Sequence, residues 1–211
     1  MILKHIQNVL QNLYQLECEH SVENFLLDEE ASQNYREKNP WIRQSDEVLY
    51  VQQEEENLDI GIFLNPKLLQ QFSELNLEQT QAHQISALAP LMEGVSHFVY
   101  LLYKSGHEQQ VTQLELELQA EIDKFILGNI VWKEKSSEWL MQQLFEGTKW
   151  NQELSEKEKE RYRQAHRFAS KYCSKLRSFF RIEKSLEELC KEIRPFYRMD
   201  QSEKLHYIQA L

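Results

Sequence analysis

Four side chains in this sequence have the types and spacing of a metal site. Glu93 and His97 stand four residues apart, and Glu117 and Glu121 repeat this spacing. Residues four apart lie on one face of a helix, so each pair would present its side chains together. Helical bundles build metal sites by projecting carboxylates and imidazoles from facing helices. We therefore take Glu93, His97, Glu117 and Glu121 as candidate ligands for a divalent metal, the one cofactor that the sequence suggests.

The same side chains also have an interpretation without a metal. Lys124 is close enough in sequence to neutralise Glu117 and Glu121 on a helix surface. Di-iron bundles space Glu and His three residues apart rather than four, and the chain has no HExxH motif. His97 would then be a hydrogen-bonded histidine on a narrow polar stripe of a buried helix.

A row of arginines is the second chemical signal. Residues 161–181 contain no Asp or Glu, and helical projection aligns four guanidinium groups within about 40° of one line. These are Arg163, Arg167, Arg177 and Arg181. Arginine binds phosphate and carboxylate through paired hydrogen bonds, so the row predicts a face for a phosphate-bearing ligand, nucleic acid or an acidic protein. The alternative is a solvated face whose charge offsets an acidic N-terminal part.

The distribution of charge restricts where such a partner could bind. The chain carries 24 Lys and Arg against 34 Asp and Glu, for a net charge of −10. Residues 1–150 have a balance of −14, whereas residues 151–211 have a balance of +4. A globally acidic chain repels nucleic acid, so we expect any nucleic-acid binding to be confined to the C-terminal part.

Other catalytic motifs are not evident in the sequence. The five glycines are scattered singly, so there is no Gly-rich phosphate loop, and no nucleophile elbow or Cys–His pairing is apparent. We therefore predict a non-catalytic binding or regulatory protein that holds an anionic partner on the arginine row. The alternative is a metal-dependent enzyme, hydrolytic or oxygen-using, with its centre between helices 90–105 and 112–131 and one carboxylate acting as general base on metal-bound water.

The N-terminal elements are expected to be two helices and a hairpin. Apolar residues recur every three or four positions over 2–16, and Ser21 is expected to cap a second helix. The segments 47–51 and 58–64 are rich in β-branched and aromatic residues and predict antiparallel strands around a polar loop. The sequence therefore predicts a mostly α fold, α+β only through one hairpin near 47–64.

From Gln79 onward the pattern is helical. A capping box at 112–115 opens the helix that carries Glu117, and a second box at 155–158 opens a long helix that Pro195 should end. Pro90 indicates a helix start or a kink, and Gly94 indicates a close approach of helices. We expect one compact domain over 1–211. A division into helices plus hairpin at 1–78 and a helical bundle at 79–211 is the alternative.

The expected compartment is the cytoplasm. Three cysteines without a close pair indicate reduced thiols, and residues 1–8 lack the basic lead and apolar stretch of a signal peptide. The most apolar run, Val95–Tyr103, falls short of the about 20 residues that a membrane span needs, and it predicts a buried helix. We therefore expect no membrane attachment.

Some segments resemble parts of uncharacterised bacterial proteins of similar length. They are Glu93-Gly-Val-Ser-His-Phe98 and Leu114-Glu-Leu-Glu-Leu-Gln-Ala-Glu-Ile-Asp-Lys-Phe125, with Arg161-Tyr-Arg-Gln-Ala165 and Tyr172-Cys173 similar as well. The resemblance implies a bacterial cytoplasmic origin and no mechanism.

Overall fold

The computed structural model describes residues 2–54, 57–146, 154–181 and 186–211. Over these ranges the chain forms nine α-helices, three short 3₁₀ helices and one three-stranded sheet, which confirms the predicted mostly α fold with a small β part. The α-helices are α1 (Ile2–Tyr14), α2 (Glu29–Lys38), α3 (Pro66–Gln71), α4 (Ile85–Gly106), α5 (Gln113–Val131), α6 (Ser137–Phe145), α7 (Glu156–Arg181), α8 (Leu186–Arg198) and α9 (Gln201–Gln209). The 3₁₀ helices are η1 (Val22–Phe25), η2 (Leu77–Gln79) and η3 (Ala82–Gln84).

The sheet has the strand order β1–β3–β2. Strands β2 (Glu47–Glu54) and β3 (Asn57–Leu64) form the predicted antiparallel hairpin, paired from Glu47 opposite Leu64 to Glu54 opposite Asn57. The strands therefore continue into most of the polar segment that was expected to be loop. Strand β1 (Leu26–Leu27) pairs in parallel with β3, and two residues are too few to show a strand pattern in the sequence.

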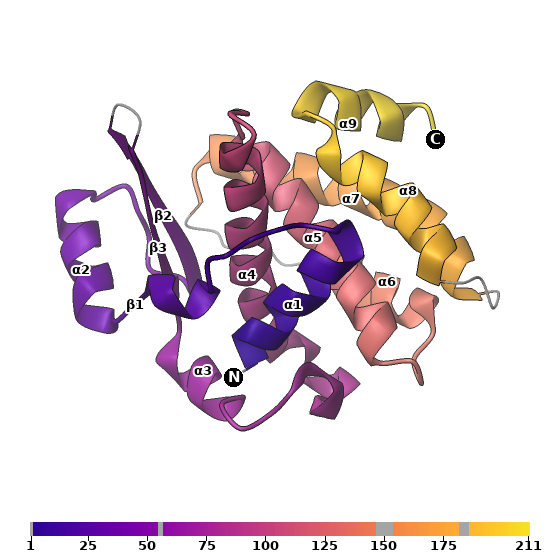
Figure 1. Ribbon diagram of the computed structural model, residues 1–211, viewed down its shortest axis with the longest axis horizontal. Coiled ribbons are helices and arrows are strands. Elements are labelled where there is room, and N and C mark those ends of the chain that lie inside the picture. Colours follow the sequence, from indigo (N-terminus) through magenta and orange to yellow (C-terminus); the bar gives the residue numbers. More distant parts are fainter. Residues whose placement is uncertain (1, 55–56, 147–153, 182–185) are drawn as a thin grey trace.

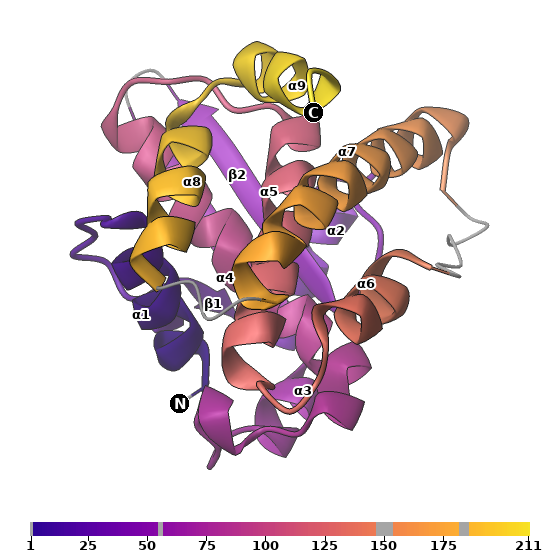
Figure 2. The same cartoon turned by 90° about the vertical axis from the view of Figure 1, so that its right-hand side faces the viewer.

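The sheet lies between α2 and α4, and the other long helices follow on the far side of α4 (Figure 1). On the outer face, the hydroxyls of Ser32 in α2 and Tyr50 in β2 are 2.9 Å apart. On the inner face, α4 contacts both β2 and β3 and then packs on α5. Helix α7 crosses α5, with α6, α8 and α9 packed beside α7 (Figure 2). Helix α4 is thereby enclosed by protein on opposite sides.

This enclosure accounts for the apolar character of α4. The segment Ala82–Gly106 is long and apolar enough to cross a membrane by length and composition alone, but 67% of its apolar window is buried inside the protein. Leu88, Leu91 and Val95 are fully buried against neighbouring elements. The segment thus behaves as a core helix of a folded domain. Pro90 lies inside α4, which begins at Ile85, so this proline does not mark the start of the helix.

Two helix predictions are wrong. Ser21 precedes the 3₁₀ helix η1, and the next α-helix begins only after Asp28, whose carboxylate accepts a hydrogen bond from the N–H of Ala31. Because β1 pairs with β3, the chain between these two helices is extended.

Pro195 lies inside α8 instead of ending the helix that carries the arginine row. Ile193 and Phe196 beside it are buried, and this packing outweighs the backbone hydrogen bond that proline lacks.

Candidate metal centre

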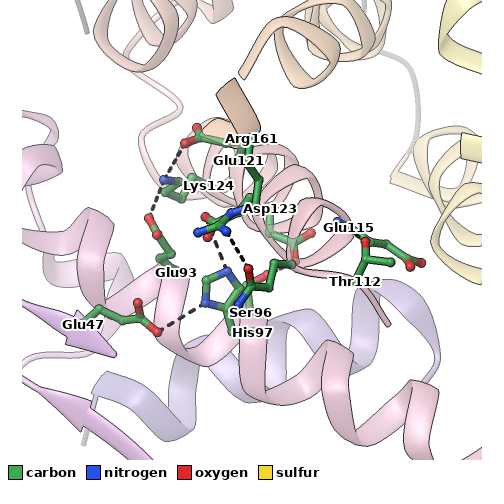
Figure 3. A network of polar contacts seen from close by, with 12 residues as sticks. Glu47, Glu93, Ser96, His97, Thr112, Glu115, Glu121, Asp123, Lys124 and Arg161 are labelled. Atoms are coloured by element: carbon green, nitrogen blue, oxygen red, sulfur yellow. Dashed lines mark hydrogen bonds and ion pairs between the residues drawn. The ribbon is translucent and has the colours of Figure 1, made fainter. Parts of the chain in front are cut away.

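Helices α4 and α5 bring three of the four predicted ligands together. Figure 3 shows the two that α4 carries, Glu93 and His97. One nitrogen or oxygen atom from each of Glu93, His97 and Glu117 can be chosen so that the three atoms lie within 4.8 Å of one another. Ligands of one tetrahedral ion, each about 2.1 Å from it, are about 3.4 Å apart, so these atoms would have to approach one another by up to about 1.4 Å to bind an ion.

Glu121 does not join this group. Its carboxylate accepts a hydrogen bond of 3.1 Å from the ammonium group of Lys124, which also donates to Glu93 at 2.8 Å. Glu121 is one helical turn beyond Glu117 and is therefore turned toward the lysine. Lys124 thus pairs with Glu121, as expected, and also with Glu93, whereas the ion pair of Glu117 is with His97 instead of Lys124.

Glu47 is the residue of the centre that sequence reasoning missed. It is the first residue of β2, and its Oε1 lies 3.3 Å from Nδ1 of His97. At the other ring nitrogen, Oε2 of Glu117 lies 4.0 Å from Nε2. The imidazole ring thus lies between the carboxylate of Glu47 on β2 and the carboxylate of Glu117 on α5.

Gly94 allows β2 to approach α4 closely enough for this contact. A Cβ atom at this position would lie 2.8 Å from Cδ2 of Leu64 and 3.0 Å from Cγ of Glu47. The close approach predicted from Gly94 is confirmed, although it involves the sheet rather than a second helix. In the sequence, this glycine one turn before His97 was the only signal that another element comes near the histidine.

The centre is largely shielded from solvent. The exposed fraction of the side chain is 6% for His97, 12% for Glu47, 14% for Glu117 and 25% for Glu93. Glu93 is the most exposed of these four side chains.

Burial and charge act in opposite directions on the ionisation of the centre. Burial lowers the pKa of His97, but the carboxylates of Glu47, Glu117 and Glu93 raise it more, and the resulting pKa is about 9. Burial raises the pKa of Glu117 to about 7, with opposing effects from the cations His97 and Arg161. The ligand set therefore holds protons near neutral pH that a metal ion would have to displace.

One atom of the centre lacks a partner. Among the residues that the structure describes, the buried Nε2 of His97 has no hydrogen-bond partner. A buried polar atom without a partner is unusual, and such atoms commonly bind a water or an ion or have a functional role. Nε2 is also the ring nitrogen that faces Glu117, so the unpartnered atom lies within the ligand set.

The arginine row is less uniform than its spacing suggested. Arg163 and Arg167 are exposed on α7, with Arg163 3.7 Å from Glu160 and Arg167 over the ring of Phe168. Arg177 is half-buried and lies 3.7 Å from Glu138 of α6. The side chain of Arg181 falls outside the described part of the chain. Two of the four predicted guanidinium groups are thus observed facing solvent.

Comparison with known proteins adds no functional information. A scan against protein-family models, a search of curated proteins and a search of solved structures each find no match. The bacterial origin and the cytoplasmic location stay predictions, and function has to be argued from the residues of the chain itself.

Proposed function

We propose that the protein binds one divalent metal ion through Glu93, His97 and Glu117 and uses it in hydrolytic chemistry. The observation that carries this proposal is the arrangement around His97. Glu47 occupies Nδ1 at 3.3 Å, while the buried Nε2 lies 4.0 Å from Oε2 of Glu117 and has no hydrogen-bond partner in the described ranges. Metal-bound histidines commonly donate their second ring N–H to a carboxylate, which fixes the tautomer and leaves the other nitrogen for the ion.

The donor set favours a transition-metal ion. Imidazole suits zinc, iron and other transition metals, whereas carboxylates also accept manganese and harder cations. Zn²⁺, Fe²⁺ and Mn²⁺ are therefore the ions to test. Glu47 would act as the positioning residue for His97, and Lys124 would donate a hydrogen bond to Oε2 of Glu93.

Three protein ligands support a catalytic role over a purely structural one. Structural zinc sites use four protein ligands, whereas catalytic sites use three and keep a position for water. An ion held by Glu93, His97 and Glu117 would supply activation of a water molecule, because a divalent ion can lower the pKa of water to about 7. Hydrolysis is the reaction class that this centre supports best.

The decisive experiment measures metal content and affinity in protein purified without a metal-affinity tag. We expect about one equivalent of metal by elemental analysis and a lower melting temperature after chelation. In calorimetric titrations with Zn²⁺ and Mn²⁺, Glu117→Gln and His97→Ala should weaken binding at least tenfold. Glu121→Gln is the matched control, because it makes the same change one turn further along α5 and should retain wild-type affinity.

Two results would overturn the proposal. The first is the absence of bound metal together with a melting temperature that chelation does not change. The second is equal loss of affinity in Glu117→Gln and Glu121→Gln, because it would indicate non-specific attraction of the ion by negative charge.

A second candidate function is the binding of an anionic partner by α7. The exposure of Arg163 and Arg167 favours it, since the side chain of Arg163 is 50% exposed. Binding to RNA, DNA and an acidic peptide should weaken steeply with salt, and the double variant Arg163→Glu/Arg167→Glu should lose it. Equal, weak binding by the wild type and the double variant would contradict this candidate.

A further inference from the structure

A cavity of about 270 Å³ lies between α4 and the segment that follows α1. This segment runs across α4 before it enters η1 (Figure 1). Helix α4 contributes Val99, Leu102, Tyr103 and Gly106 to the wall of the cavity. These residues have the spacing i, i+3, i+4 and i+7, so they form one stripe along the helix. At about 100° per residue, His97 projects from the opposite side of α4, and the cavity is therefore separate from the metal centre.

The other wall of the cavity is anchored by two glutamines of α1. Gln11 donates a hydrogen bond of 3.2 Å to the carbonyl oxygen of Cys18, and Gln7 donates one of 2.7 Å to the carbonyl oxygen of His20. Gln7 also accepts a hydrogen bond of 2.8 Å from the N–H of Val22. Cys18 and His20 both line the cavity. A wall that is already held in place does not have to be ordered when a ligand binds, and this favours affinity.

The cavity has apolar residues on both sides. Leu16 lines it from the segment after α1, and Val99, Leu102 and Tyr103 line it from α4. An apolar cavity of about 150 Å³ is enough to bind benzene. A volume of about 270 Å³ therefore has room for an aromatic ring with a short side chain.

Two acidic residues also line the cavity, and no Lys or Arg is among its described lining residues. They are Glu17 and Glu19, which are both exposed. Neither side chain has an ion pair or a hydrogen bond within the part of the chain that the structure describes. Their carboxylates attract a cation, and the net charge of −10 adds to this attraction. Aromatic rings such as that of Tyr103 attract cations as well.

We propose that this cavity binds a small organic amine. Its hydrocarbon part lies between Leu16 and the apolar stripe of α4, and its ammonium group lies beside Glu17 and Glu19. The apolar walls favour an organic ligand over a bare metal ion. The carboxylates favour a cation over a carboxylic acid of the same shape. This site is independent of the proposed metal centre and of its hydrolytic function.

The first test is calorimetric titration of the full chain with phenethylamine and with 3-phenylpropionate, which has a similar shape and the opposite charge. We expect phenethylamine to bind at least tenfold more tightly. The double variant Glu17→Gln/Glu19→Gln should weaken the binding of phenethylamine at least fivefold. Glu29→Gln/Glu30→Gln is the matched control, because it removes the same charge from exposed positions of α2 and should stay within twofold of wild type.

A second test locates the bound amine through Cys18. This cysteine lines the cavity and is partly exposed, whereas Cys173 and Cys190 are buried. Dithiodipyridine, which is uncharged and reacts with thiols but not with amines, should therefore modify Cys18 first. Saturating phenethylamine should slow this modification at least fivefold, as measured by the absorbance of the released thiopyridone and by mass spectrometry of the peptide that contains Cys18.

Three results would overturn the proposal. The first is that phenethylamine does not bind, or binds no more tightly than 3-phenylpropionate, because the cavity would then not select an amine. The second is equal weakening in the two double variants, because it would indicate attraction by the overall negative charge. The third is binding of phenethylamine that leaves the modification rate of Cys18 unchanged, because the amine would then bind elsewhere.

Discussion

Lys124 determines how much negative charge a metal ion must balance at the centre. Its ammonium group contacts Glu93 at 2.8 Å and Glu121 at 3.1 Å, and its side chain is only 8% exposed. Burial lowers the pKa of this lysine, but the two carboxylates raise it more, so the group stays charged. Lys124 therefore competes with a metal ion for Glu93.

This competition predicts opposite effects of Lys124→Met on stability and on metal binding. Without metal, the variant should lose about 3–5 kcal/mol, because two partly buried carboxylates lose their cation. With Zn²⁺ or Mn²⁺, the rise in melting temperature should exceed that of the wild type. Lys133→Met, at an exposed lysine, should change neither quantity. An equal or smaller metal-induced rise in Lys124→Met would show that Lys124 does not compete.

Residues of the centre differ in how far the sequence could predict them. Glu93, His97 and Glu117 share two neighbouring helices, so helical spacing was enough to nominate them. The same spacing nominated Glu121, because periodicity does not show which carboxylate a lysine will bind. Glu47 contacts His97 across 50 positions of the chain, and only the packing of a strand on α4 creates that contact.

At the scale of elements, the closeness of β2 and α4 depends on Gly94. In Gly94→Ala, the new Cβ would lie 2.8 Å from Cδ2 of Leu64 and 3.0 Å from Cγ of Glu47, so these two side chains must shift. We expect a loss of about 1–3 kcal/mol in stability from overpacking. Metal affinity should fall as well, because Glu47 would no longer hold His97 in place.

A matched substitution on the same helix controls for the intrinsic helix preference of alanine. A Cβ at Gly106 would meet nothing within 4 Å. Gly106→Ala should therefore keep wild-type metal affinity and gain up to about 1 kcal/mol. Thermal melts and metal titrations of the two variants make the comparison, and identical behaviour would contradict the assigned role of Gly94.

Element boundaries were predictable where local hydrogen bonds set them. Thr112 caps α5 by accepting from the N–H of Glu115, which is half of the predicted capping box, while the carboxylate of Glu115 pairs with Tyr100 and Lys104 instead. Tertiary packing decided the other cases. Leu26 and Leu27 became an edge strand because β3 lies beside them, and Pro195 is tolerated inside α8 because the surrounding side chains are buried.

At the scale of the whole molecule, a buried polar network connects helices that are far apart in sequence. Lys204 of α9 is 0% exposed and donates to the hydroxyl of Tyr100 at 2.7 Å and to Oε1 of Gln119 at 2.8 Å. Gln119 in turn donates to Asp123, which also accepts from the hydroxyl of Tyr14. The last helix of the chain is thereby tied to α4, α5 and, through these bonds, α1.

Lys204 should make the stability of the protein depend on pH in a defined direction. Burial lowers the pKa of this lysine to about 7, with Lys104 acting in the same direction and Glu115 and Asp123 opposing it. In the unfolded chain its pKa is about 10.4. Between these values the unfolded state binds a proton that the folded state does not, so the free energy of unfolding rises with pH by about 1.4 kcal/mol per unit. Below about pH 7 both states are protonated, and the folded state carries the full cost of a buried charge.

Lys204→Met should remove this dependence. Relative to the wild type, the free energy of unfolding of the variant should therefore be highest near pH 7 and should fall steadily as the pH rises toward 10. Urea unfolding at pH 7, 8, 9 and 10 measures the difference directly, and subtraction of the two curves cancels the groups that both proteins share. Lys67→Met, at an exposed lysine, should show the same pH dependence of the free energy of unfolding as the wild type. If Lys204→Met also kept the pH dependence of the wild type, Lys204 would have to be equally protonated in the folded and unfolded states. The buried network would then carry a permanent charge.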